Sequence, residues 1–149
     1  MLTDPEGLWG SGDHKKMTEA GFKKAMSDLG EGKRPDEECQ KVMLDILKAS
    51  NVGQDSGDAF NDLRRHYNRG LIQNEKDLDD EYAAYLEKEK KAFDAALTGQ
   101  ECKDALEALG RLCHSWQDFF AHAKRKGTTA LITPAIVYVA WTSPETPLI

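Results

Sequence analysis

The sequence of 149 residues lacks several features that mark common classes of protein. It has only three cysteines (Cys39, Cys102 and Cys113), an odd number with no CxxC spacing. We therefore expect free thiols in a reducing compartment and no disulfide framework. No stretch approaches the ~18 apolar residues of a membrane-spanning helix. The first residues also lack the basic and then apolar pattern of a signal peptide. We find no internal repeat and no linker, which predicts a single domain.

An excess of positive charge is also missing. Twenty Lys and Arg residues stand against 26 Asp and Glu residues, which gives a formal net charge of -6. This balance argues against a protein that holds nucleic acid by bulk electrostatics, but not against a nuclease whose metal ions contact the phosphate. With 40% hydrophobic and 31% charged residues, the chain has the composition of a globular protein that can bury a core.

Hydrophobic periodicity and capping residues predict an all-α fold, a single helical domain of about five helices. Helices are expected over residues 18–29, 35–50, 58–67, 74–97 and 101–126. Residues 1–14 are expected to form an extended entry, with Thr18 capping the first helix. The Glu and Lys run at 87–91 predicts a solvated face. Residues 128–141 are apolar and β-branched, which predicts an extended apolar C-terminal tail that packs over the bundle or, less commonly, faces lipid.

The most informative stretch is Leu109-Gly-Arg-Leu-Cys-His-Ser-Trp-Gln-Asp-Phe-Phe-Ala-His122 in the last predicted helix. His114, Asp118 and His122 stand at i, i+4 and i+8, on one helix face and about 6 Å apart along the axis. The other faces are mostly apolar, and a buried charge needs a partner. The stripe therefore predicts a metal site in which Asp118 bridges ions. Gly110 continues the stripe one turn earlier, where a missing side chain leaves room for a bound group.

Two more histidines complete the four in the chain. His66 follows three aspartates in the stretch 55–62, and His14 lies five residues after Trp9. A histidine taken alone is more often an ordinary core or surface residue than a metal ligand. A metal cluster requires these residues to converge with the stripe on the last helix.

The order of these residues resembles that of the zinc-dependent phospholipase C / P1 nuclease superfamily. The resemblance rests on Trp9-x4-His14, an Asp followed by His66, and His114-x3-Asp118, and it covers residues 9–122. The phrase Leu-Gly-Arg-x-x-His-Ser-x-Gln-Asp-Phe-Phe-Ala-His is similar to the Het-C-like variant, in which the last His follows the Asp by four. In this superfamily an N-terminal Trp binds zinc through its free amine and its carbonyl.

A second motif lies at the start of the chain. Asp4-Pro-Glu-Gly-Leu8 resembles the DPxGL junction that ends the core of Rhs/YD-repeat polymorphic toxins, where the core's own aspartyl protease cuts after the Leu. Cleavage after Leu8 would make Trp9 the first residue, which is the arrangement that the zinc superfamily requires. The resemblance implies that residues 1–8 end an Rhs core and carry the processing site, and that residues 9–149 form a metal-dependent toxin domain.

Carried over residue by residue, the resemblance implies zinc ions that share Asp118. The expected ligands are Asp55, His66, His114 and Asp118 for one ion, and Trp9, His14 and Asp118 for a second. Asp58 is the next choice after Asp55. His122 would enter a third site, but no histidine follows it. The third site is then incomplete, finished by water, or part of a longer natural domain.

The resemblance implies hydrolysis of phosphodiester bonds by a zinc-bound hydroxide, because zinc lowers the pKa of its bound water to about 7. Asp118, His114 and His66 are the expected catalytic residues. Arg65 and Arg69 are expected to bind phosphate, with a solvated basic patch as the alternative. We expect a phospholipase C-like activity from the acidic balance and the apolar tail. A zinc-dependent nuclease of the P1 type is the alternative, and a non-catalytic helical interaction module is the alternative of another class.

The Rhs motif also implies a biological setting. The protein is expected to be an antibacterial effector of interbacterial competition, secreted without a signal peptide and delivered into a target cell through a type VI-like system. Its expected partners are the rest of the Rhs core shell, a cognate immunity protein, and a phospholipid or nucleic-acid substrate.

Overall fold

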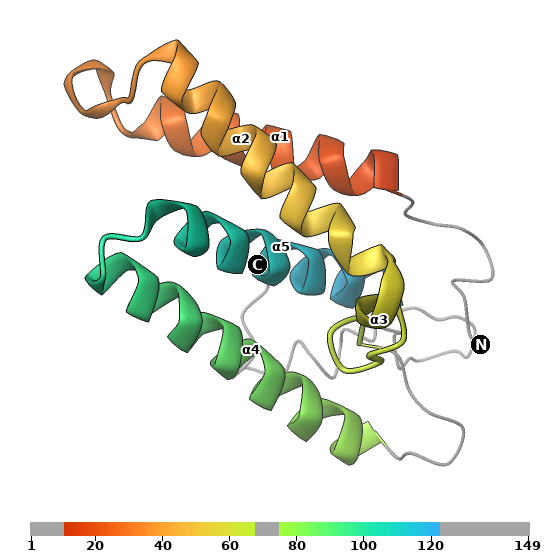
Figure 1. Cartoon of the computed structure of the whole chain (residues 1–149). Helices are drawn as coiled ribbons and strands as arrows, with labels where there is room; N and C mark the ends of the chain where they lie inside the picture. The colour runs from red at the N-terminus through yellow and green to blue at the C-terminus, as the bar shows by residue number, and fades with distance from the viewer. Residues whose placement is uncertain (1–10, 68–74, 123–149) are drawn as a thin grey trace.

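The computed structural model describes residues 11–67 and 75–122, and all regular secondary structure in these residues is helical (Figure 1). The elements in chain order are α1 (Ser11–Asp28), η1 (Glu31–Lys33), α2 (Glu37–Val52), η2 (Gly53–Asp55), α3 (Gly57–Phe60), α4 (Glu75–Thr98) and α5 (Cys102–His122), where η marks a short 3-10 turn. The predicted all-α fold of about five helices is confirmed. The expected apolar tail lies outside the described residues. None of the described helices is both long and apolar enough to span a membrane.

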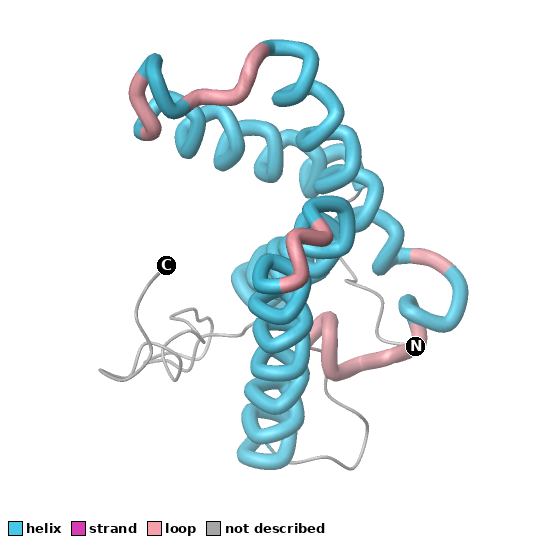
Figure 2. Tube along the Cα trace, turned by 60° about the vertical axis from the view of Figure 1, so that its left-hand side comes forward, coloured by secondary structure: helices cyan, strands magenta, loops and turns pink. Residues whose placement is uncertain are grey.

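Helix α5 is the centre of the bundle. It packs along α2 on one side and along α4 on the other, while α1 lies mainly on α2 and also reaches α5 (Figure 1). Short connections join α1 to α2 and α4 to α5 (Figure 2). Because α5 is covered on two sides, its apolar residues recur three or four positions apart over much of its surface. The buried hydrophobic residues are Leu47, Leu78, Tyr82, Tyr85, Ala96, Ala105, Ala108, Leu112 and Phe119.

The start of α2 agrees with its sequence signals. The Asp36 carboxylate accepts a hydrogen bond from the backbone N–H of Cys39 at 2.7 Å, as an N-cap residue does. Glu37 and Glu38 occupy the first turn, where the helix dipole favours negative charge. The prediction of a helix start at this point is confirmed.

Two predicted boundaries are wrong for a shared reason, which is that side-chain contacts override local propensity. Helix α1 begins at Ser11, so Thr18 is not its cap but a buried mid-helix residue. The predicted helix over 58–67 ends at Phe60. After it, the Asp62 carboxylate accepts hydrogen bonds from the backbone N–H and the side chain of Arg64, and such local bonds compete with a helix.

The expected solvated face at 87–91 is interrupted at Glu89. This side chain is buried, and its carboxylate accepts a hydrogen bond from Nε of Arg111 on α5 at 2.7 Å. The charged run therefore contributes one ion pair to the contact between α4 and α5. Its neighbours Glu87 and Lys91 are exposed, as predicted.

Gly110 allows α2 and α5 to approach closely. A Cβ atom added at Gly110 would lie 2.7 Å from Cβ of Ser50 and 2.8 Å from the carbonyl oxygen of Leu47. The Ser50 hydroxyl also donates a hydrogen bond to the backbone oxygen of Glu107 at 2.6 Å. The expectation that this glycine leaves room for a bound group is wrong, because α2 fills the space.

We predict that Gly110→Ala lowers the free energy of unfolding by about 1–3 kcal/mol, the typical cost of overpacking. The new methyl group must displace α2, which outweighs the gain of about 1 kcal/mol in helix propensity. Gly21→Ala in α1 is the matched control, since that position is exposed and a Cβ there meets nothing within 4 Å. Urea denaturation measures the free energy of unfolding of both variants. Equal stability of the two variants would contradict the close approach.

Candidate metal centre

Five side chains with metal-ligand chemistry meet where the residues that follow α2 lie against the C-terminal half of α5. They come from four separate parts of the chain, which are the start of α1, the end of η2, the turns after α3, and the middle of α5. These residues are His14, Asp55, His66, His114 and Asp118. The i, i+4 spacing of His114 and Asp118 places both on the same face of α5, as the sequence predicts.

Asp118 is the hub of this cluster. Its Oδ1 lies 3.1 Å from Nε2 of His14. Its Oδ2 lies 2.6 Å from Nδ1 of His66 and 2.9 Å from Nε2 of His114. The two oxygens of one carboxylate thus face different histidines, which is the arrangement that a bridging ligand needs.

The cluster is enclosed on most sides. The exposed fraction is at most 4% for His14, His66, His114 and Asp118, whereas the Asp55 side chain retains 28%. Asp55 Oδ1 lies 3.5 Å from Nε2 of His114. The cluster is therefore reached from solvent most directly at Asp55.

The outward-facing ring nitrogens of the three histidines each meet a carbonyl oxygen. Nδ1 of His14 lies 2.7 Å from Oε1 of Gln117, and Nδ1 of His114 lies 3.2 Å from Oδ1 of Asn51. Nε2 of His66 lies 3.2 Å from the backbone oxygen of Ala59. Since a carbonyl oxygen only accepts hydrogen bonds, each ring donates an N–H outward. The inward nitrogen then donates to Asp118 when the ring is protonated, and presents a lone pair when the ring is neutral.

The inward-facing histidine nitrogens and the Asp118 oxygens lie so close together that a proton or a cation must lie between them. Nε2 of His114 lies 3.0 Å from Nδ1 of His66, and both lie within 3 Å of an Asp118 oxygen. With the rings neutral and donating outward, these contacts bring lone pairs together. A cation removes this repulsion, and imidazole nitrogens with carboxylate oxygens are a ligand set that suits zinc.

One group of four residues is compact enough for a single ion. His14, Asp55, His114 and Asp118 each offer one atom, and these atoms all lie within 4.8 Å of one another. His66 adds a further nitrogen at Oδ2 of Asp118. The described residues thus offer three imidazole nitrogens and carboxylate oxygens from two aspartates.

The electrostatics of the cluster favour an ionised Asp118. Burial opposes its charge, but hydrogen bonds from His114, His14 and His66 outweigh burial and hold the pKa of Asp118 well below its usual range. Burial also disfavours charge on His14 and His66. Hydrogen bonds to Asp118 outweigh it and raise the pKa of both rings. Protons and a metal ion therefore compete for the same nitrogens.

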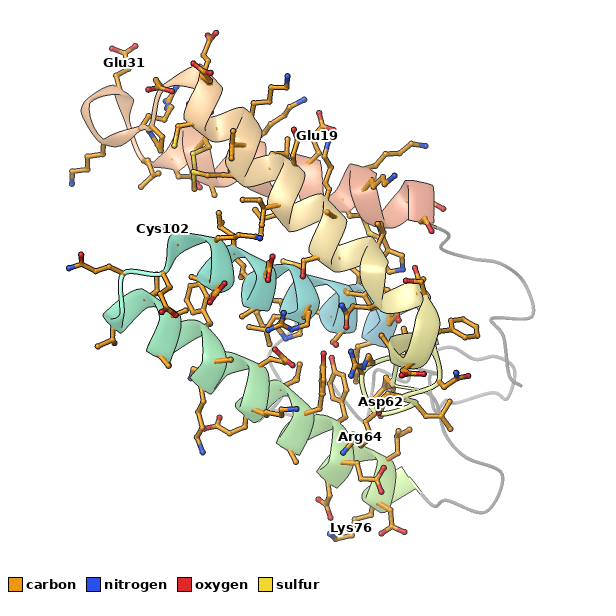
Figure 3. All side chains as sticks on the ribbon, in the orientation of Figure 1. Glu19, Glu31, Asp62, Arg64, Lys76 and Cys102 are labelled. Carbon is orange, nitrogen blue, oxygen red and sulfur yellow. The ribbon has the colours of Figure 1, made fainter. Side chains whose placement is uncertain are left out.

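Arg65 lies beside the cluster, held by other side chains. Its Nη1 donates to Oε1 of Gln54 at 2.5 Å, its Nη2 lies 3.1 Å from Oδ2 of Asp62, and its guanidinium lies over the ring of Tyr85. Figure 3 shows Asp62 and Arg64 adjacent in the turns after α3. Phosphate binding by Arg65 stays a prediction, and Arg69 lies outside the described residues.

The other residues expected at the site are distributed as follows. Asp58, the second choice for the acid, is exposed on α3. Trp9 and the processing residues Asp4 and Leu8 lie outside the described residues. His122 is the last residue of α5, and its side chain also lies outside them.

Sequence reasoning missed the amides that contact the histidines. Gln117 lies within the central motif, next to Asp118, so its position carried a usable signal. The position of Asn51 carried no such signal, because the predicted helix over 35–50 ends before it, whereas Asn51 is a buried residue in the last turn of α2.

A comparison of the chain with protein-family models, with curated proteins and with solved structures found no match.

We predict that Asp62 stabilises the fold in a pH-dependent way. Hydrogen bonds from Arg64, followed by those from Arg65, lower the pKa of Asp62 from 3.8 to about 2. Because the folded-state pKa is the lower one, its contribution is complete above about pH 5 and is lost as the pH falls through 2. Asp62→Asn should therefore unfold at lower urea than the native protein at pH 6, and this difference should shrink toward pH 3. Asp58→Asn is the control, and a difference independent of pH would contradict the prediction.

Proposed function

We propose that this chain is a zinc-dependent phosphodiesterase, the toxin domain of an Rhs-type effector, with phospholipid as its substrate. The observation that carries the proposal is the convergence of His14, Asp55, His66, His114 and Asp118 on one buried point. Their order along the chain is the one that the zinc-dependent phospholipase C / P1 nuclease resemblance implies. The chance of unrelated histidines meeting an aspartate in this way is small when the chain has only four histidines.

The two oxygens of Asp118 suggest how ions would be shared. The resemblance assigns Asp55, His66, His114 and Oδ2 of Asp118 to one zinc ion. His14, which it assigns to a second ion, also offers an atom within 4.8 Å of those of Asp55, His114 and Asp118. His14 and Oδ1 of Asp118 would contribute to a second, which Trp9 would complete. Zinc, when bound by these residues, would supply a Lewis acid that polarises the phosphate and would lower the pKa of its bound water to about 7.

The protein's own contribution is orientation and a dry environment. The carbonyl oxygens of Gln117, Asn51 and Ala59 fix the three rings, so their inward nitrogens need no reorganisation to bind. Burial of Asp118 keeps the field of its charge strong, because little water screens it. Asp55 forms the accessible edge, so we propose that the phosphodiester approaches from the side of η2.

We predict that Asp118→Asn abolishes both metal binding and activity while the fold survives. The substitution preserves shape but removes the charge that contacts three histidines. Zinc content should therefore fall below one ion per chain and the rate of hydrolysis by at least about 100-fold. The measurements are zinc content, circular dichroism and release of phosphorylated headgroup from phosphatidylcholine vesicles by a protein that begins at Trp9. Single-stranded DNA and RNA are assayed in parallel.

Asp58→Asn is the matched control for this substitution, since Asp58 is exposed and outside the cluster. It should retain full zinc content and activity. Cleavage of DNA or RNA but not of phospholipid would assign the site to a nuclease. A folded native protein that binds no zinc and cleaves none of the three substrates would contradict the proposal.

We also predict that cleavage of the chain after Leu8 increases its zinc content and its rate of phosphodiester hydrolysis. An amide nitrogen at Trp9 of an uncleaved chain cannot donate a lone pair to zinc as a free amine can. Protein beginning at Trp9 should therefore hold more zinc and hydrolyse faster than a form that retains residues 1–8 and resists cleavage. A form with one alanine added before Trp9 controls for the mere presence of a free amine. Equal zinc content in all three forms would exclude a role of the Trp9 amine.

A further inference from the structure

Two amide side chains link the candidate metal ligands behind the cluster. Asn51, on α2, is fully buried, and Gln117, on α5, is half-buried. Nδ2 of Asn51 donates to Oε1 of Gln117 at 3.0 Å and lies 2.9 Å from Oγ1 of Thr18. Nε2 of Gln117 donates to the same Thr18 hydroxyl at 3.2 Å. Thr18 is itself buried on α1, so the network ties three helices together.

Each amide also presents its oxygen to a histidine. Oδ1 of Asn51 accepts from Nδ1 of His114, and Oε1 of Gln117 accepts from Nδ1 of His14. Asn51 therefore uses both N–H groups on oxygen acceptors and its oxygen on a ring N–H. Each N–H of Asn51 therefore faces an acceptor, and its oxygen faces a donor.

The orientation of one amide dictates that of the other. Turning Asn51 over alone would bring its oxygen to 3.0 Å from Oε1 of Gln117, which places two acceptors face to face. It would also direct an N–H at Nδ1 of His114, and the ring proton would then have to move to Nε2. A proton on Nε2 points at Asp118 and occupies the lone pair that a metal ion needs.

We propose that Asn51 and Gln117 are coupled positioning residues that hold the ring protons of His114 and His14 on Nδ1. Both Nε2 lone pairs are thereby directed at Asp118. The inference rests on the metal centre of the proposed function, but it concerns the tautomers of the rings and not the reaction. Hydrogen-bond partners of this kind typically change metal affinity by about 10–100-fold.

Two isosteric amide-to-acid substitutions have opposite expected results. Gln117→Glu keeps an oxygen for His14 and for Nδ2 of Asn51, and its second oxygen meets Thr18, whose hydroxyl can turn to donate. Zinc affinity should stay within about threefold of the native value or rise, because a carboxylate is the stronger acceptor for a ligating histidine. A merely structural role predicts no such tolerance of a charge at this half-buried position.

Asn51→Asp should instead change the tautomer of His14, a ring that residue 51 does not contact. The carboxylate at position 51 still accepts from Nδ1 of His114, but its second oxygen now faces Oε1 of Gln117. Gln117 must turn its amide over, which directs an N–H at Nδ1 of His14 and moves that ring's proton to Nε2. Zinc affinity should fall at least about tenfold, with the tautomer changed at His14 and unchanged at His114.

The test combines zinc affinity, from competition with a chelator, with long-range ¹H–¹⁵N NMR of the histidine rings. Spectra are recorded on metal-free and zinc-loaded protein beginning at Trp9, at a pH where the rings are neutral. The expected native result is Nδ1–H on both His14 and His114. The proposal is overturned by Nε2–H on either ring of the native protein, by equal zinc affinity of the two variants, or by weaker binding in Gln117→Glu than in Asn51→Asp.

The controls keep these outcomes separable. Circular dichroism shows whether each variant folds. If Asn51→Asp does not fold, the tautomers of the native protein and the zinc affinity of Gln117→Glu test the proposal. Gln117→Leu removes the acceptor and should bind zinc at least about tenfold more weakly than Gln117→Glu. No assay here uses a phosphodiester, so a protein that hydrolyses nothing leaves the test of the tautomers intact.

Discussion

A buried negative charge on Asp118 is the constraint on which the rest of this structure depends. An ionised carboxylate that is 3% exposed is costly unless donors or cations surround it, and here three imidazole rings do so. The rings arrive from the start of α1, the turns after α3 and α5 itself. The packing of these segments against α5 is thus coupled to the state of one carboxylate. Protonation or metal binding at Asp118 therefore affects stability as well as chemistry.

Contacts with α2 and α4 fix the position of α5, the helix that carries Asp118. Gly110 brings α2 into backbone contact with it, Ser50 adds a hydrogen bond across that contact, and Tyr82 on α4 donates to the carbonyl oxygen of Ser115 on the opposite side. These contacts lie within about three turns of Asp118. A ligand held on a helix that is fixed from both sides keeps its geometry better than one on a loop.

The sequence predicted the fold class and the shared helix face of His114 and Asp118 because periodicity and spacing are local properties. The i, i+4 relation of His114 and Asp118 follows from helix geometry alone. The start of α1 could not be predicted in this way, since His14 and Thr18 are buried by contacts with residues about 30 to 100 positions away. The role of Asn51 was hidden for the same reason. Its amide oxygen contacts the ring of His114, which is 63 residues away in the sequence. No short-range pattern in the sequence indicates such a contact.

Charge balance connects the number of ions to the kind of ligand that the site would accept. Asp55 and Asp118 bring two negative charges, and the three histidines are neutral when their inward nitrogens bind a metal ion in place of a proton. One divalent cation would cancel that charge and leave an electrically balanced site. Two would leave an excess of positive charge in a region that little water screens, and such a site attracts an anion. A carboxylate whose oxygens face separate histidines is suited to the second case, and the diester group of a phospholipid or nucleic acid is an anion of the required kind.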